Sequence, residues 1–166
     1  TEIYTLSLHD ALPIYDNMAN WFNEEVAADW MEDRQKMMTI LQEEAELNEI
    51  VQMVGMDALS PTDRLKMEAA RSIREDFLHQ NSFHEIDTYT PLRKQYLMMK
   101  LVLAFYEKSV DALNKGADMN ALIAMPVREK IGRYKYTTDA DIESEYKNVE
   151  EELDKEVAAA FGKEDF

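Results

Sequence analysis

Few residues of this chain have the types and the spacing that nucleotide chemistry requires. A phosphate-binding loop has the pattern G-x-x-x-x-G-K-[ST], because glycine amides surround the phosphates and the lysine reaches them. The Gly-Lys pair of this chain is Gly162-Lys163, near its end, and Glu164 stands where the pattern needs Ser or Thr. These residues fit the end of a helix better than a phosphate site. We therefore expect no nucleotide hydrolysis from this chain alone.

Histidines and carboxylates gather between residues 79 and 87, where they could bind a metal ion or act in catalysis. His79 and His84 are five residues apart, which places them on different faces of a helix, and no H-E-x-x-H motif is present. Glu85 and Asp87 could form a carboxylate pair, but carboxylates in loops more often cap helices or pair with arginine. We predict no metal site and no catalytic residue in this chain.

The composition indicates an acidic, helical protein. The chain has 166 residues, enough for one domain with a core, and its formal net charge is −16. Such a charge argues against nucleic acid and anionic membranes as partners, because both attract clustered Lys and Arg. There is no cysteine, which excludes disulfides and thiolate metal sites. No apolar run approaches the roughly 20 residues of a membrane span, so no direct membrane insertion is expected.

The apolar periodicity predicts an all-α fold, a bundle of about six helices without strands. Ser60 is expected to cap a helix with Pro61 in its first turn, and Thr90-Pro91 repeats this arrangement before the helix expected to be the longest. Asp118 is expected to cap a short helix, and Thr138 or Asp139 to begin the last one. Helical periods cover 15–30, 33–54, 60–79, 90–116, 119–124, 126–131 and the residues from 138 or 139 onward.

Two of these helices have clear apolar stripes. The helix at 90–116 is apolar on several sides, which is typical of a helix at the centre of a core, and Leu103 lies in its seam. The helix at 33–54 has one apolar face, formed by Met37, Ile40, Leu41, Leu47, Ile50, Val51 and Val54. Residues 80–89 lack a helical period and are expected to form a structured loop. The basic run Arg128 to Lys135 could meet an acidic partner or the acidic helices of this chain.

The first fourteen residues resemble a sequencing artefact. Thr1 to Ile14 reads TEIYTLSLHDALPI, which is the translation of a common short-read sequencing adapter. We therefore expect residues 1–14 to be non-native, and exclude them from reasoning about the fold. The native gene is expected to extend further upstream, which would make this chain a fragment.

Several ordered blocks resemble the C-terminal region of the catalytic A subunit (alpha chain) of V/A-type ATPases and ATP synthases. The first block is Leu41 to Leu59, LQEEAELNEIVQMVGMDAL. It is followed by Asp63-Arg64, by Ala70 to Tyr89 with the sequence ARSIREDFLHQNSFHEIDTY, by Lys94-Gln95, and by Pro126 to Tyr136 with the sequence PVREKIGRYKY. Met56 replaces a proline that is usual in the family, and Thr90 a frequent cysteine. The resemblance covers residues 15–136, and residues 137–166 are similar only as an acidic helix.

This resemblance implies the fold, the partners and the location. Residues 15–136 would be the helical domain below the ATP-binding domain of a subunit that alternates with non-catalytic B subunits around central-stalk subunits. The whole assembly would couple ATP synthesis or hydrolysis to proton or sodium transport, as a cytoplasmic head peripheral to the membrane. ATP or ADP with Mg²⁺ would bind to the intact subunit, through residues upstream of this chain, and no cofactor is expected for the chain alone.

The resemblance also implies one site residue. In the family, a phenylalanine in the Q-N-x-F segment helps to form the adenine pocket, and Phe83 occupies that position. A competing interpretation makes Phe83 an apolar anchor of its own loop. Two other functions remain open at this point: a stand-alone acidic helical interaction module, and an independent helical-bundle enzyme, for which no acid–base or metal constellation exists.

Overall fold

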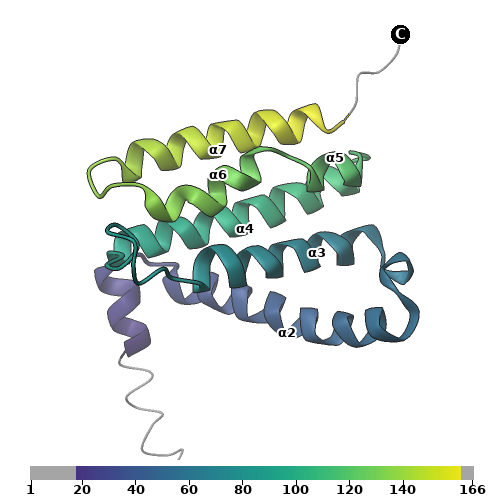
Figure 1. Cartoon of the computed structure of the whole chain (residues 1–166), viewed down its shortest axis with the longest axis horizontal. Coiled ribbons are helices and arrows are strands. Elements are labelled where there is room, and N and C mark those ends of the chain that lie inside the picture. The colour runs from purple at the N-terminus through teal and green to yellow at the C-terminus, as the bar shows by residue number, and fades with distance from the viewer. Residues whose placement is uncertain (1–17, 162–166) are drawn as a thin grey trace, which may run out of the picture.

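The computed structural model describes residues 18–161, and this part of the chain is a helical bundle (Figure 1). A helical segment at 18–25 comes first, and no strand occurs within 18–161. The predicted all-α bundle of about six helices is therefore confirmed. Residues 1–14 and the Gly162-Lys163 pair lie outside the described residues. The named α-helices are α2 (Trp30–Val54), α3 (Pro61–Ser72), α4 (Leu92–Asn114), α5 (Met119–Ile123), α6 (Val127–Arg133) and α7 (Ile142–Ala159). Shorter turns are η1 (Met56–Ala58), the π-helical η2 (Ile73–Leu78) and η3 (Tyr134–Tyr136).

Polar caps set the starts of two helices as the sequence predicted. The Ser60 hydroxyl accepts a hydrogen bond from the Asp63 amide at 3.1 Å, and Pro61 fills the first position of α3, where no amide hydrogen is needed. The Asp118 carboxylate accepts from the Ala121 amide at 2.7 Å and caps α5 in the same way. These local bonds satisfy amides that have no partner inside the helix.

Three helix predictions were wrong in detail. Thr90 does not cap α4, because its hydroxyl donates to the carbonyl of Asp87 at 3.3 Å and Pro91 takes the cap position. α4 is not the longest helix among the described residues, since α2 has 25 residues and α4 has 23. α7 begins at Ile142 rather than at 138 or 139, because the Thr138 hydroxyl donates to the Asp141 carboxylate in the turn before it.

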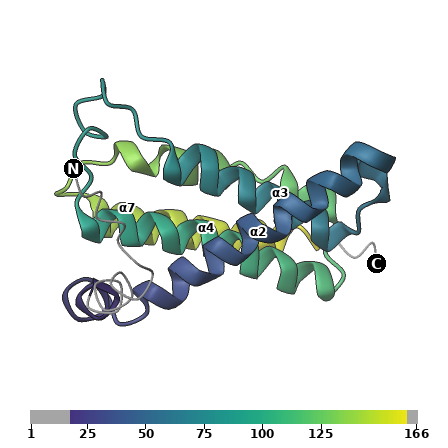
Figure 2. The ribbon, with the colours of Figure 1, turned by 90° about the horizontal axis from the view of Figure 1, so that it is seen from below.

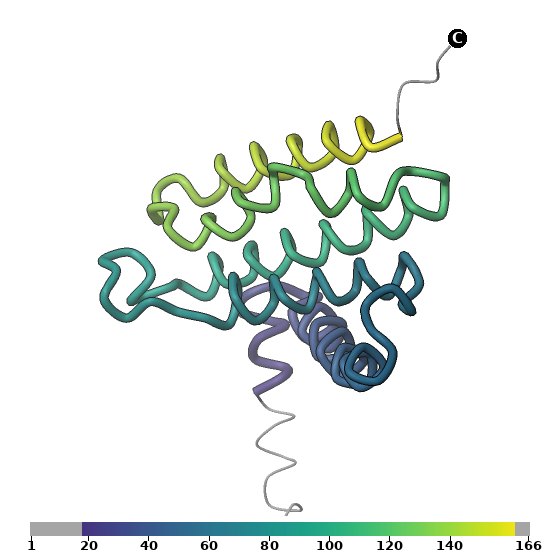
Figure 3. The backbone as a smooth tube through the Cα atoms, turned by 45° about the vertical axis from the view of Figure 1, so that its right-hand side comes forward, coloured from purple at the N-terminus to yellow at the C-terminus, as the bar shows by residue number. Residues whose placement is uncertain are grey.

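The core forms around α4, which lies between α6 and α7 on one side and α2 and α3 on the other (Figures 1 and 2). Leu101, Leu103 and Phe105 of α4 are buried, as its many-sided apolar pattern predicted. α7 contributes Val149 and Leu153 to the same core. Figure 3 looks nearly along α2 and shows that this helix crosses the others at a steep angle.

Only the first half of the apolar face of α2 is covered. Met37 and Ile40 are buried, but Ile50 and Val54, expected on the same buried face, are exposed. The exposed apolar residues at the turn between α2 and α3 form a surface that we call the apolar tip: Ile50, Met53, Val54 and Met56.

The basic run pairs with acids of the same domain, which is one of the two alternatives that the sequence left open. Arg128 bonds to Glu68 at 2.6 Å, and Lys130 bonds to Glu152 at 2.5 Å. Lys135 donates to two backbone carbonyls at the end of η2. These bonds fasten α6 to α3 and α7, and η3 to η2.

Candidate functional site

The loop between η2 and α4, residues 79–91, is closed by hydrogen bonds to one buried residue, Asp87. Asp87 is 2 % exposed, and its Oδ2 accepts a hydrogen bond from the Asn81 amide at 2.6 Å. Its carbonyl accepts from Gln80 Nε2 at 2.6 Å. Both ends of the loop are thereby held together. Asp87 thus organises the backbone of the loop through its carboxylate and its carbonyl, rather than capping a helix or pairing with an arginine as expected from the sequence.

His84 stabilises the middle of the same loop through a hydrogen bond and a ring contact. Its Nδ1 accepts a hydrogen bond from the Ile86 amide at 3.2 Å, and its ring lies 4.4 Å from the ring of Tyr136, centroid to centroid. The Thr88 hydroxyl donates to the His84 carbonyl at 2.6 Å. Across residues 18–161, no group of three or more His, Asp and Glu side chains is placed to hold a metal ion.

A buried lysine supports the loop from below. Lys94 of α4 is completely buried, and its Nζ donates to the Thr137 carbonyl at 2.7 Å. Burial lowers the pKa of this amine, while Asp139 and Asp87 act in the opposite direction. Gln95 Nε2 also donates to the Thr90 carbonyl at 2.8 Å. Gln95 therefore fixes the loop to α4, and Lys94 fixes α4 to the segment that leads into α7.

This well-bonded loop presents two aromatic side chains to solvent. Phe83 is 97 % exposed, and its amide donates to Asn81 Oδ1 at 3.0 Å, while Tyr89 is 85 % exposed. The interpretation of Phe83 as an apolar anchor of the loop is wrong, because its ring contacts almost nothing within the described chain. An aromatic ring on a fixed loop is well placed to stack on a group that lies outside this domain.

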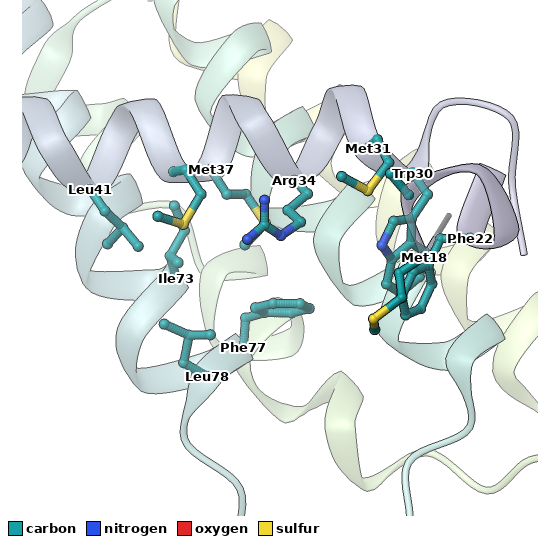
Figure 4. A pocket seen from close by; sticks show the side chains of 12 residues that line it. Met18, Phe22, Trp30, Met31, Arg34, Met37, Leu41, Ile73, Phe77 and Leu78 are labelled. Atoms are coloured by element: carbon teal, nitrogen blue, oxygen red, sulfur yellow. The ribbon is translucent and has the colours of Figure 1, made fainter. Parts of the chain in front are cut away.

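An apolar groove lies beside the loop. It has a volume of about 430 Å³ and runs between the helical segment 18–25, α2 and η2. Figure 4 shows Phe77 and Leu78 facing Met37 and Leu41 across it, with other apolar side chains at the far end. Phe77 and Leu78 also line a second pocket, of about 220 Å³, under the loop itself. The groove and the loop therefore form one continuous face.

The sequence did not predict the groove or the exposure of the apolar tip. Periodicity predicted helices over 15–30 and 60–79, which contain Met18, Phe22 and Phe77, but it could not show that the apolar sides of these helices remain partly uncovered.

Residues 18–161 thus form an all-helical domain that carries an exposed aromatic loop and an apolar groove. A family model for the C-terminal domain of V and A type ATP synthase matches residues 19–123. The chain belongs to this family, which confirms the resemblance seen in the sequence blocks.

Similar curated proteins support the same family assignment. The V-type ATP synthase alpha chain of Acetivibrio thermocellus is 53 % identical over 149 residues, which is 90 % of this chain and 25 % of the relative. The alpha chain of Clostridioides difficile is 51 % identical over 83 % of this chain and 23 % of its own length. Alpha chain 1 of Clostridium tetani is 51 % identical over 86 % and 24 %. The chain spans about a quarter of the length of the relatives it matches. Between residues 18 and 161, no helix has the length and apolarity needed to cross a membrane.

Proposed function

We propose that this chain is the C-terminal domain of the catalytic alpha subunit of a V/A-type ATP synthase, and that it completes the adenine pocket and transmits the nucleotide state to the central stalk. The intact subunit would alternate with B subunits and couple ATP synthesis or hydrolysis to proton or sodium transport. It would bind ATP or ADP with Mg²⁺ through upstream residues, in a cytoplasmic head peripheral to the membrane. The chain alone would be inactive.

The observation that carries this proposal is the exposure of Phe83 on a loop that is otherwise fixed. A flexible loop would lose backbone conformational entropy on binding, but here the loop backbone is already held by Asp87 and His84. Stacking on a nucleobase contributes roughly 1–3 kcal/mol per base in known nucleic-acid sites. The Phe83 ring would stack on the adenine base of a nucleotide that the neighbouring domain holds.

The arrangement of the helices supports a mechanical role. The loop with Phe83 and the apolar tip lie at opposite ends of the bundle (Figures 1 and 2). α2 has 25 residues and is therefore roughly 37 Å long, and α3 runs beside it. A displacement at the nucleotide end would move the apolar tip, where exposed Met53 and Val54 offer a surface for a stalk subunit.

Nucleotide affinity of the full-length subunit tests this function. Phe83→Ala should weaken ATP binding by about 5- to 150-fold, which corresponds to the loss of 1–3 kcal/mol. Tyr89→Ala is the matched control, because it removes an exposed aromatic ring from the same loop. An affinity that is equal in wild type and Phe83→Ala would exclude Phe83 from the adenine pocket.

A further inference from the structure

The apolar groove beside the loop is built from three elements that are distant in sequence. Met18 and Phe22 come from the helical segment 18–25, Met31 comes from α2, and Phe77 and Leu78 come from η2 (Figure 4). Arg34 is the one charged residue among its lining side chains. An apolar surface of this kind is stabilised when another apolar surface covers it.

Several residues that line the groove remain open to solvent. Met18, Met38 and Leu78 are all exposed, with Leu78 at 57 %. The wall is nevertheless firmly built: the ring of Phe22 stacks on that of Trp30 at 5.1 Å, centroid to centroid, and Asn23 Oδ1 accepts a hydrogen bond from the Met31 amide at 3.1 Å. The groove is thus a preformed concave surface.

The length of the relatives indicates what could cover this surface. The chain matches about a quarter of each relative, in a family defined as the C-terminal domain, so the remaining three quarters precede it. In a longer subunit, that part would precede the helical segment 18–25, which is itself one wall of the groove. A tethered domain has a high effective concentration at its own attachment point, so even a small apolar contact would be occupied.

We propose that this groove is the docking surface for the part of the same polypeptide that precedes the helical domain in the longer subunit. This inference rests on the proposed function, because it takes the chain to be part of a longer alpha subunit. Since Phe77 and Leu78 line both the groove and the pocket under the loop, docking there would place the preceding domain next to Phe83. The groove would then hold the adenine-facing loop in register with the nucleotide.

Cysteine labelling tests the proposal, because the chain has no cysteine of its own. Leu78→Cys and Met38→Cys place a thiol in the groove, and Met53→Cys places one at the apolar tip as a control. Each variant is prepared as the isolated chain and within the full-length subunit. Maleimide labelling rates are read at each site by peptide mass spectrometry, and circular-dichroism melts confirm that each variant folds.

We expect both groove cysteines to react at least about tenfold more slowly in the full-length subunit than in the isolated chain, as covered sites do. The cysteine at position 53 should react at about the same rate in both, within the scatter expected for exposed sites. Equal rates for the groove cysteines in the two proteins would overturn the proposal. Groove cysteines that are protected in the isolated chain and react faster on dilution would also overturn it, because a second copy would then be the occupant.

The two proposals fail in different ways. Protection of the groove together with unchanged nucleotide affinity in Phe83→Ala would support docking and refute the adenine pocket. Unprotected groove cysteines together with weakened nucleotide binding in Phe83→Ala would support the adenine pocket and refute docking. If Leu78→Cys does not fold, the labelling rate of Met38→Cys decides whether the groove is covered, because this α2 residue also lines the groove.

Discussion

The conformation of the loop that carries Phe83 should depend on the carboxylate of Asp87. In the folded chain, the buried Asp87 carboxylate accepts a hydrogen bond from the Asn81 amide at 2.6 Å. Asp87 is also one of the acids near the fully buried Lys94. A hydrogen bond to a charged group contributes about 1.5–3 kcal/mol. Asp87→Ala removes this bond and leaves the Asn81 amide without its acceptor. We therefore expect the free energy of unfolding to fall by about 1.5–3 kcal/mol in urea titrations of the isolated chain.

Amide hydrogen exchange measures the effect of Asp87→Ala on the loop itself. If the Asp87 bond closes the loop, the Asn81 amide in Asp87→Ala should exchange about 10- to 150-fold faster, which is the same energy expressed as a rate. Glu85→Ala is the control, because it removes an exposed carboxylate from the same loop and should change stability by less than about 0.5 kcal/mol.

The reasoning would be refuted by an Asp87→Ala variant that unfolds within about 0.5 kcal/mol of wild type and keeps the slow exchange of the Asn81 amide. Such a result would mean that the loop is held by its other bonds, and that Asp87 is buried for a different reason.

Three further predictions concern the bundle that holds this loop. Leu103→Ala should lower the free energy of unfolding by roughly 2–5 kcal/mol, whereas Met53→Ala, which truncates an exposed side chain, should change it by less than about 0.5 kcal/mol in the same urea titration. Ser60→Ala should cost about 1 kcal/mol through loss of the cap of α3, which thermal melts would detect. The hydrogen bond from Lys100 holds the pKa of Asp29 below its usual value. The stabilisation is therefore complete above the unfolded pKa of about 3.9 and is lost as pH falls through the lower folded pKa, so Asp29→Asn should destabilise the chain at pH 7 but not at the acid end of a pH series.

Local signals in the sequence predicted the elements well. Ser60 and Asp118 cap their helices because the bond that defines a cap lies within three residues, so the sequence contains the whole interaction. Thr90 looked the same, yet its hydroxyl donates to Asp87. In a loop with several competing acceptors, a cap pattern alone does not decide which bond forms.

Tertiary contacts account for what the sequence could not predict. The stripe on α2 marked Ile50 and Val54 as apolar, but periodicity identifies a face and not the element that covers it. The burial of Lys94 depends on the Thr137 carbonyl, which lies more than forty residues away, so no local pattern contains it. Phe83 was found through its sequence motif, and its exposure could only come from the fold.

Photolabelling of the full-length subunit with 2-azido-ATP tests most directly whether this domain faces the nucleotide. The account predicts that the label attaches to the peptide containing Phe83, that excess ATP prevents the labelling, and that the isolated chain is not labelled, because the phosphate site lies upstream. Labelling that is confined to upstream peptides, with none on residues 79–91, would contradict the claim that this loop completes the adenine pocket.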